Sequence, residues 1–305
     1  MKMKRGKIII AFLVISLITI IPLISAGFFD EIYSKITGKA TSDTTALNIT
    51  IGNAEPTITW VESISSKNPT EDTITSITFT FTVTDTDGYI NVDTNSAKAY
   101  FQKGGETTRS NLSCVNTDNS GDDANFSCTI DMWYFDLNTD WTINVTAKDI
   151  NDAYAENSST TFTYNILPAM KMSPTSLGWP SVSLTDTDTG SDDDPIVINN
   201  TGNDNGLTIN VASYDLEGED TNTEYIFANN FTVGLTSEGC SGTAMVNNTG
   251  TEVGSAVLNK GNHSINDGST GQEEIFFCLK GVPQDISAQS YSSAAFGAWT
   301  VEIVS

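Results

Sequence analysis

Four cysteines are the residues of this 305-residue chain whose type and number suggest covalent chemistry: Cys114, Cys128, Cys240 and Cys278. No two are spaced as Cys-x-x-Cys, and His263 is the single histidine, so a zinc site is not expected. In an oxidising compartment, which the N-terminus described below favours, an even number of cysteines predicts two disulfides, with three pairings open. The domain boundary argued below favours Cys114 with Cys128 and Cys240 with Cys278.

Nine asparagines stand in the Asn-x-Ser/Thr pattern that accepts N-linked sugar. They are Asn48, Asn111, Asn125, Asn144, Asn157, Asn199, Asn230, Asn247 and Asn262. The composition, rich in Asn, Ser and Thr, would produce most of them by chance. In five, the middle residue is apolar (Ile49, Leu112, Phe126, Val145 and Phe231), which on a strand buries that residue and turns the Asn outward. We therefore expect some of the nine to carry glycan.

Two of these patterns, NLS and NFS, immediately precede Cys114 and Cys128 in the sequence. On a strand, residues three apart point to opposite faces. We expect Leu112 and Phe126 to lie inside with the cysteines, Asn111 and Asn125 to lie outside, and the segment VNTDNSGDDA to form a polar loop.

Closely spaced carboxylates could hold a hard cation, because calcium takes several oxygen ligands. One group is Asp85, Asp87 and Asp93, and the other begins with Asp186 and Asp188. Neither matches the EF-hand loop, since Val197 stands where the bidentate Glu of that loop would be required. Turn-forming Asp on a solvated loop is the simpler interpretation. A structural calcium ion is the alternative, and no other cofactor is expected.

The densest aromatic group, MWYFD, contains Trp133 and Tyr134. Exposed aromatic rings could form a platform for a sugar, whereas core packing is the simpler interpretation. Catalysis has little support: one histidine provides no triad, and the chain has no P-loop, dinucleotide fingerprint or G-x-S-x-G motif. The chain is predicted not to be an enzyme.

The N-terminus begins with four basic residues in MKMKRGK, followed by the apolar run IIIAFLVISLITIIPLISA. This pattern predicts a secretory signal peptide over residues 1–26. The alternatives are an uncleaved N-terminal membrane anchor and a prepilin-type leader that is cut after KRG. Residues 27–45 follow as a short amphipathic segment and a polar tether. With no apolar helix near the C-terminus, any membrane contact is expected through the N-terminal segment.

Charge separates this start from the rest of the chain. Residues 40–305 hold 8 basic and 36 acidic side chains, a net charge of −28. Such a body is repelled by nucleic acid and by anionic membrane, so neither is an expected partner.

Strict alternation of apolar and polar residues begins at Ala46. ALNITIGN, ITFTFTVT, WTINVTAK and TFTYNI each place their apolar side chains on one face. This period of two predicts antiparallel strands with one wet face. Residues 46–166 are therefore predicted to form one β-sandwich.

A second β-rich region, residues 167–305, follows the proline-containing segment NILPAMKMSPTS. Its expected strands lie in PIVINN, LTINVASY, NFTVGLT, EEIFFCLKGV and AWTVEIVS. The strand containing IFFCL is apolar on both faces, which predicts a central position. The chain is thus predicted to be all-β, with two β-sandwich domains behind an N-terminal apolar helix or signal segment.

Three stretches resemble known families. The leader with its short aromatic segment and ITGKATS resembles the start of exported cell-surface proteins of nanosized archaea, which implies the compartment only. VTDTDGYI and DWTINVTAKDINDAYAENSSTTFTYN resemble immunoglobulin-like modules of prokaryotic surface proteins. INNTGN and VPQDISAQSYSS are similar to the camelysin and biofilm-fibre type of β-sandwich.

We therefore predict an extracellular or cell-surface protein with a structural or adhesive role. Its expected partners are the cell envelope, other surface proteins or further copies of itself. One alternative is a filament subunit, pilin-like or donating TTALNITIGN to the sheet of a neighbour. A carbohydrate-binding module is the other.

Overall fold

The computed structural model describes residues 47–305, and the predicted leader (1–26) and amphipathic segment with tether (27–45) lie outside the described residues. The described part is all-β, as predicted, with antiparallel pairing in every sheet. Within it, helical structure is limited to short 3-10 turns, Tyr89–Asn91 (η2), Ala228–Asn230 (η3) and His263–Ile265 (η4). No helix of residues 47–305 is long and apolar enough to cross a membrane.

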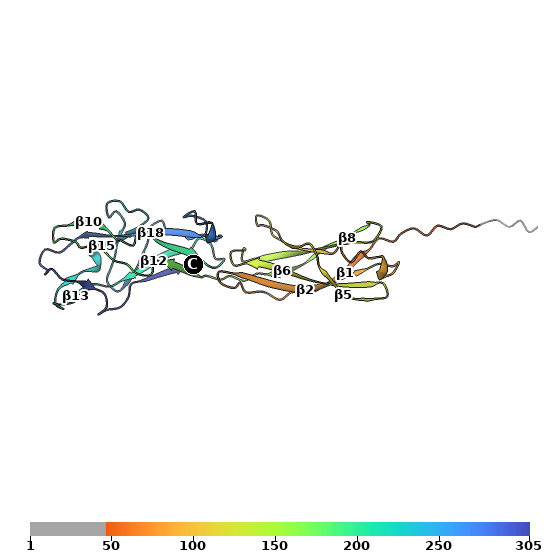
Figure 1. Ribbon diagram of the computed structural model, residues 1–305, viewed down its shortest axis with the longest axis horizontal. Coiled ribbons are helices and arrows are strands. Elements are labelled where there is room, and N and C mark those ends of the chain that lie inside the picture. The colour runs from red at the N-terminus through yellow and green to blue at the C-terminus, as the bar shows by residue number, and fades with distance from the viewer. Residues whose placement is uncertain (1–46) are drawn as a thin grey trace, which may run out of the picture. The chain divides into compact units, whose positions relative to one another are not determined.

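Two four-stranded sheets enclose the first hydrophobic core. One has the order β1-β2-β6-β5 and the other β4-β3-β7-β8. The strands of the first are β1 (Thr57–Val61), β2 (Ile74–Thr84), β5 (Val115–Ser120) and β6 (Asp123–Trp133). Those of the second are β3 (Lys98–Gln102), β4 (Arg109–Asn111), β7 (Asp140–Lys148) and β8 (Tyr154–Thr163). Strands β2 and β6 pair over eleven residues each and run side by side in Figure 1.

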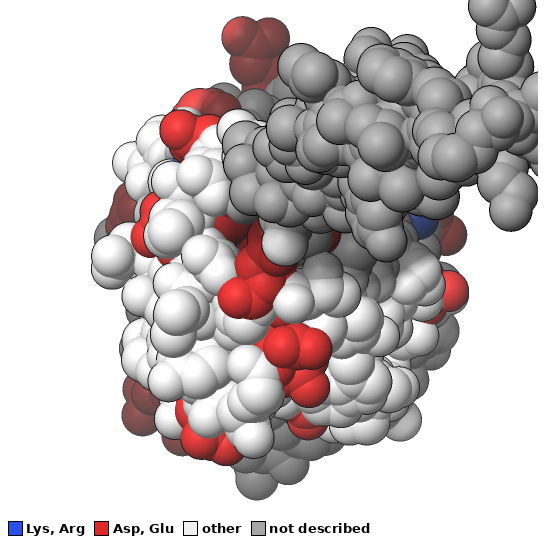
Figure 2. All heavy atoms as spheres, turned by 90° about the vertical axis from the view of Figure 1, so that its right-hand side faces the viewer, with Lys and Arg blue, Asp and Glu red and all other residues white. Residues whose placement is uncertain are grey.

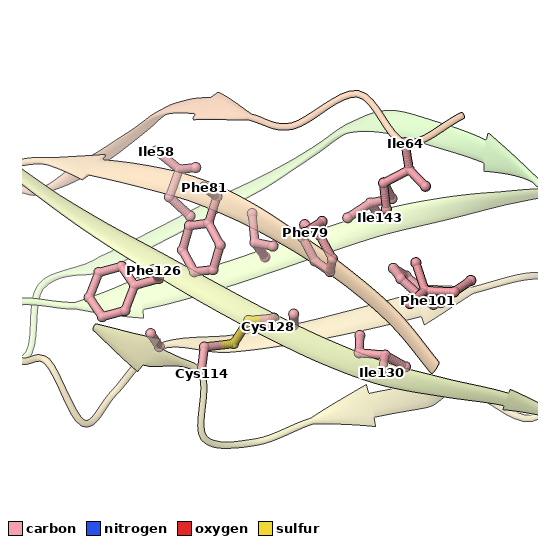
Figure 3. Packing of buried hydrophobic residues seen from close by; sticks show 14 of the residues in the cluster. Ile58, Ile64, Phe79, Phe81, Phe101, Cys114, Phe126, Cys128, Ile130 and Ile143 are labelled. Carbon is pink, nitrogen blue, oxygen red and sulfur yellow. A yellow bond between two sulfur atoms is a disulfide. The ribbon is translucent and has the colours of Figure 1, made fainter. Parts of the chain in front are cut away.

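The apolar face of each alternating strand points into this core, as predicted. Phe79 and Phe81 of β2 meet Phe126 of β6 and Phe101 of β3, all fully buried. Trp141 and Tyr164 are fully buried as well. Figure 3 shows these phenylalanines between the strands, with the Cys114–Cys128 disulfide beside them. Period-two alternation therefore identifies the core-facing aromatic side chains of these strands.

Three further sheets surround the second core. The largest has the order β16-β15-β18-β11-β9, with β10 also paired to β18, and the smaller ones are β17-β12-β20 and β14-β13-β19. Strands of the largest sheet are β9 (Met170–Ser173), β10 (Thr187–Gly190), β11 (Ile196–Asn200), β15 (Phe231–Gly234), β16 (Thr243–Ala244) and β18 (Gln272–Gly281). The others are β12 (Thr208–Ser213), β17 (Thr249–Glu252), β20 (Thr300–Val304), β13 (Leu216–Gly218), β14 (Tyr225–Ile226) and β19 (Tyr291–Ser292). Strand β18, which contains IFFCL, is central as predicted, because β15, β11 and β10 all pair with it.

Three predictions about single segments are wrong. Residues 47–53 form no strand, and Leu47, Ile49 and Ile51 are 82%, 70% and 88% exposed. Leu112 is exposed in a bend after β4, because the chain leaves the strand before it reaches Cys114. The expected polar loop VNTDNSGDDA is mostly strand: β5 and β6 are joined by the tight turn at Gly121, whose φ of 62° suits glycine.

Candidate functional site

The residues that connect the two cores form an extended polar arrangement in the described chain. Residues 53–305 make up one compact unit, so these connections lie inside it. At their centre is Asn203, which is fully buried. Its Nδ2 donates to the carbonyls of Asp136 (3.0 Å) and Asn165 (2.9 Å), and its Oδ1 accepts from the Leu167 amide (2.7 Å). This side chain donates two hydrogen bonds and accepts one, which offsets much of the cost of burying it.

The loop after β6, whose Asp136 carbonyl accepts from Asn203, is held in place by the side chain of Asp136. This buried carboxylate accepts a forked pair of bonds from Arg109 and a bond from the Trp133 amide (2.7 Å). Phe135 of the same loop lies under the Arg109 guanidinium, 5.7 Å from its ring centre. Bidentate Arg–carboxylate pairs hold a fixed geometry, so the loop after β6 is held rigidly toward the second core.

Gly202 allows the backbones to approach at this point. A Cβ added there would overlap the carbonyl oxygen of Leu167, which no larger residue could avoid. The neighbouring Thr201 donates from Oγ1 to Glu71 (2.8 Å), and its carbonyl accepts from the Asp72 amide (2.9 Å). Residues 201–203 thus join the two cores through backbone and side chain together.

Ion pairs border these buried contacts. Asp72 accepts from Lys171 (2.5 Å) and lies 2.7 Å from Nε2 of His263, and Lys260 bonds Glu106 (2.8 Å). The hydrogen bond from Lys171, reinforced by His263, lowers the pKa of Asp72 below its ordinary value. Each pair links a residue that precedes Leu167 to one that follows it.

The aromatic pair singled out in the sequence lies at this junction. Tyr134 is buried, its ring centre 5.7 Å from that of His263, and its hydroxyl finds no partner among the described residues. Burial raises the pKa of Tyr134 to about 12. Trp133 is 40% exposed and stacks on Phe135. The two rings therefore do not share one exposed face.

The acidic residues proposed for calcium do not converge. Asp85 is fully buried at the end of β2, where it accepts from the Asp87 amide (2.9 Å), whereas Asp87 accepts from the Ala54 amide. Asp93 bonds the Asn95 amide, Asp186 bonds the Ser183 amide, and Asp188 is exposed in β10. Across residues 47–305, no three His, Cys, Asp or Glu side chains are grouped to hold a metal ion. Asp85, Asp93 and Asp186 stabilise local turns, whereas Asp87 links its loop to the distant residue Ala54.

Both disulfides form as the favoured pairing predicts. Cys114–Cys128 links the start of β5 to β6 within one hairpin, with Cα atoms 4.7 Å apart. Cys240–Cys278 links the segment after β15 to the central strand β18, with Cα atoms 5.2 Å apart. Each core therefore has its own covalent link.

The nine sequon asparagines differ widely in exposure. Asn48 and Asn247 are exposed, while Asn111, Asn125, Asn157, Asn199, Asn230 and Asn262 are half-buried. Asn144 is buried in β7 and donates to Glu156 (2.7 Å). The expectation that an apolar middle residue turns Asn outward is wrong there, because β7 is covered on both faces and its pairing with β8 is irregular at this point.

Two hollows lie in the second half. One, of about 660 Å³, is lined mainly by the second core, including Trp179, Phe231, Phe277 and Trp299, and no charged side chain lines it. The other, of about 450 Å³, lies on the surface beside Tyr225, Phe227 and Asn230. Sequence reasoning placed the junction at NILPAMKMSPTS, which contains Asn165 and Leu167, but it missed Asn203 and both hollows. The local signal at Asn203 was the small, polar TGN at residues 201–203.

Comparison with known proteins adds no family: no family model and no curated protein matches this chain.

Proposed function

We propose that this chain is an exported, non-catalytic structural protein of the cell surface. In this proposal residues 46–166 form an immunoglobulin-like β-sandwich domain and residues 167–305 a second β-sandwich domain. The observation that carries the structural role is the junction centred on Asn203. A buried side chain that makes three hydrogen bonds, bordered by ion pairs, makes the two domains move as one stiff spacer rather than independently.

Export is supported by the two disulfides, since such bonds persist in oxidising compartments outside the cytosol. It is also supported by the acidic surface. Figure 2 shows carboxylates scattered between neutral areas on one face. A surface of this kind stays soluble in salt-rich surroundings. Protease treatment of intact source cells tests the location: the chain should be degraded while a cytosolic marker survives, and its protection would contradict the proposal.

The rotational tumbling of the two domains in solution tests whether the junction is stiff. ¹⁵N relaxation on the purified chain should give one rotational correlation time for both domains, whereas Asn203→Ala should give two. Asn259→Ala is the matched control, because Asn259 is exposed and makes no side-chain hydrogen bond in the described chain. If Asn203→Ala does not fold, Lys260→Ala removes the bordering ion pair with Glu106 and a long hydrogen bond to the Phe135 carbonyl, and it should loosen the junction less. Independent tumbling of the two domains in the wild type would refute the spacer.

A filament subunit is the second candidate, favoured by one combination of features. The segment 47–51 presents alternating, exposed Leu47, Ile49 and Ile51, and the 660 Å³ hollow is uncharged and includes aromatic and aliphatic side chains. Residues 40–305 of each copy carry a net charge of −28 and repel those of another copy, so an uncharged segment that enters an uncharged hollow is the favourable contact. Fibres by electron microscopy should disappear with Ile49→Asp. The same charge at Thr50, on the opposite side of the segment, should have little effect. A monomeric native protein would exclude this candidate.

A further inference from the structure

One sequon asparagine lies in a tight turn beside exposed aromatic rings. Strand β14 ends at Ile226, and the 3-10 turn Ala228–Asn230 follows. The turn closes with a hydrogen bond from the Asn230 amide to the Phe227 carbonyl (2.9 Å). Phe227 precedes the turn with an extended backbone, and both Phe227 and Asn230 line the same surface hollow. Phe227 and Asn230 are therefore neighbours on one surface.

The rings around this turn lie at the surface: Phe227 and Phe296 are exposed and Tyr225 is half-buried. Phe227 is 52% exposed, stacks on Tyr225 with ring centres 6.2 Å apart, and Tyr225 in turn contacts Phe296, which is 45% exposed. Clusters of exposed aromatic residues indicate a binding surface, because water solvates them poorly. Tyr225 and Phe227 also line the surface hollow of about 450 Å³, and Asn230 lies at the same hollow.

The amide of Asn230 can carry a sugar without losing its own contact. Its Nδ2 donates one hydrogen to the Gly281 carbonyl at 3.2 Å, and Gly281 is another residue of the hollow. An amide nitrogen has two hydrogens. Glycosylation replaces one and leaves the other for this bond.

We propose that Asn230 is glycosylated and that its first sugar occupies this hollow, packed on the face of Phe227. In the attachment, Nδ2 attacks the anomeric carbon of a lipid-phosphate-linked sugar donor held by a separate transferase. The bond from the anomeric carbon to the phosphate oxygen breaks, the lipid phosphate leaves, and a base of the transferase takes the Nδ2 proton. The inference rests on the proposed export, since the modifying enzymes meet the chain during secretion.

Two other sequons have an aromatic residue three positions earlier, and their geometry differs. Trp141 precedes Asn144 and Tyr154 precedes Asn157, but both pairs lie on strands, β7 and β8. Residues three apart on a strand point to opposite faces, so the ring cannot reach the sugar. Trp141 and Asn144 are moreover buried. The pair Tyr154 and Asn157 is consequently a matched control for Phe227 and Asn230.

Occupancy is tested by glycopeptide mass spectrometry of the native protein. Asn230 should be modified. An unmodified Asn230 overturns the inference, whether the other sequons carry sugar or not. The protease experiment on intact cells tests the export proposal separately, so a failure of that proposal can be distinguished from an unmodified Asn230.

The packing is tested by melting temperatures of four forms: wild type, Phe227→Ala, Asn230→Gln and the double variant. Phe227→Ala should lower the melting temperature by about 2–4 °C in the glycosylated chain and much less when Asn230→Gln removes the sugar. Tyr154→Ala, combined with Asn157→Gln in the same way, should show no such dependence. Equal losses for Phe227→Ala with and without the sugar would refute the contact. Because Phe227 is half exposed, truncating it leaves the fold intact.

Discussion

The carboxylate of Asp194 accepts a backbone hydrogen bond at the point where strand β18 changes its pairing partner. Strand β18 pairs with β11 up to Ile275 and with β10 from Cys278 onward. Between them, the Phe277 amide donates to both carboxylate oxygens of Asp194, each at 3.0 Å. An amide left without this acceptor would destabilise the sheet. The DTDTGSDDD segment therefore has a structural role at its last Asp.

The pH dependence of folding is expected to contain a contribution from Asp194. Burial raises the pKa of Asp194 from its ordinary value to about 6, against the hydrogen bonds from Phe277 and Ser191. A raised carboxyl pKa means that the folded state binds the proton more tightly. The stabilisation of the folded state by the protonated Asp194 carboxyl is therefore complete at pH values below the ordinary pKa of Asp. This stabilisation is lost as the pH rises through about 6.

The measurement compares the free energy of unfolding of wild type and Asp194→Asn from pH 4 to 7. The variant should gain stability relative to wild type as the pH rises, because its amide never ionises. Carboxyls whose pKa is lowered, such as Asp72 and Glu224, weaken both proteins equally in acid. Asp188→Asn, an exposed change in β10, is the control. A pH-independent difference between wild type and Asp194→Asn would contradict the assignment.

At the scale of elements, the two disulfides close loops of different size. Cys114 and Cys128 are 14 residues apart, and Cys240 and Cys278 are 38 apart. A longer closed loop restricts the unfolded chain more. The second link should thus stabilise its half of the protein more than the first.

Chemical denaturation of the two double Cys→Ser variants tests this order. Loss of Cys114–Cys128 should reduce the free energy of unfolding by about 3 kcal/mol and loss of Cys240–Cys278 by about 4 kcal/mol. The second variant should also loosen β18, where three strands meet. The reverse order would show that packing around the bonds, rather than loop closure, determines their effect.

For the whole molecule, charge is the dominant property. Residues 40–305 carry a net charge of −28, and the repulsion between their carboxylates destabilises the folded state. Dissolved ions screen this repulsion. The melting temperature should therefore rise from 10 mM to 1 M sodium chloride. Calcium and magnesium chlorides at equal ionic strength should act alike. A larger rise with calcium at micromolar concentration would indicate a specific site and revive the expectation for Asp85, Asp87 and Asp93.

What the sequence determined by itself is the local pattern. Alternation in ITFTFTVT and WTINVTAK predicted strands and their buried faces, because side-chain direction on a strand depends only on position along it. The even cysteine count and the two β-rich regions likewise predicted the disulfide pairs.

Only the tertiary structure decided which segments meet. The exposure of Leu112, the burial of Asn144 and the unpaired segment 47–53 all depend on where a strand ends or what covers it. Asn203 looks like an ordinary loop asparagine in the sequence, yet its three partners, Asp136, Asn165 and Leu167, lie 36 to 67 residues away. A periodic pattern reports the facing of one strand. It contains no information about contacts that form only when distant turns are brought together by folding.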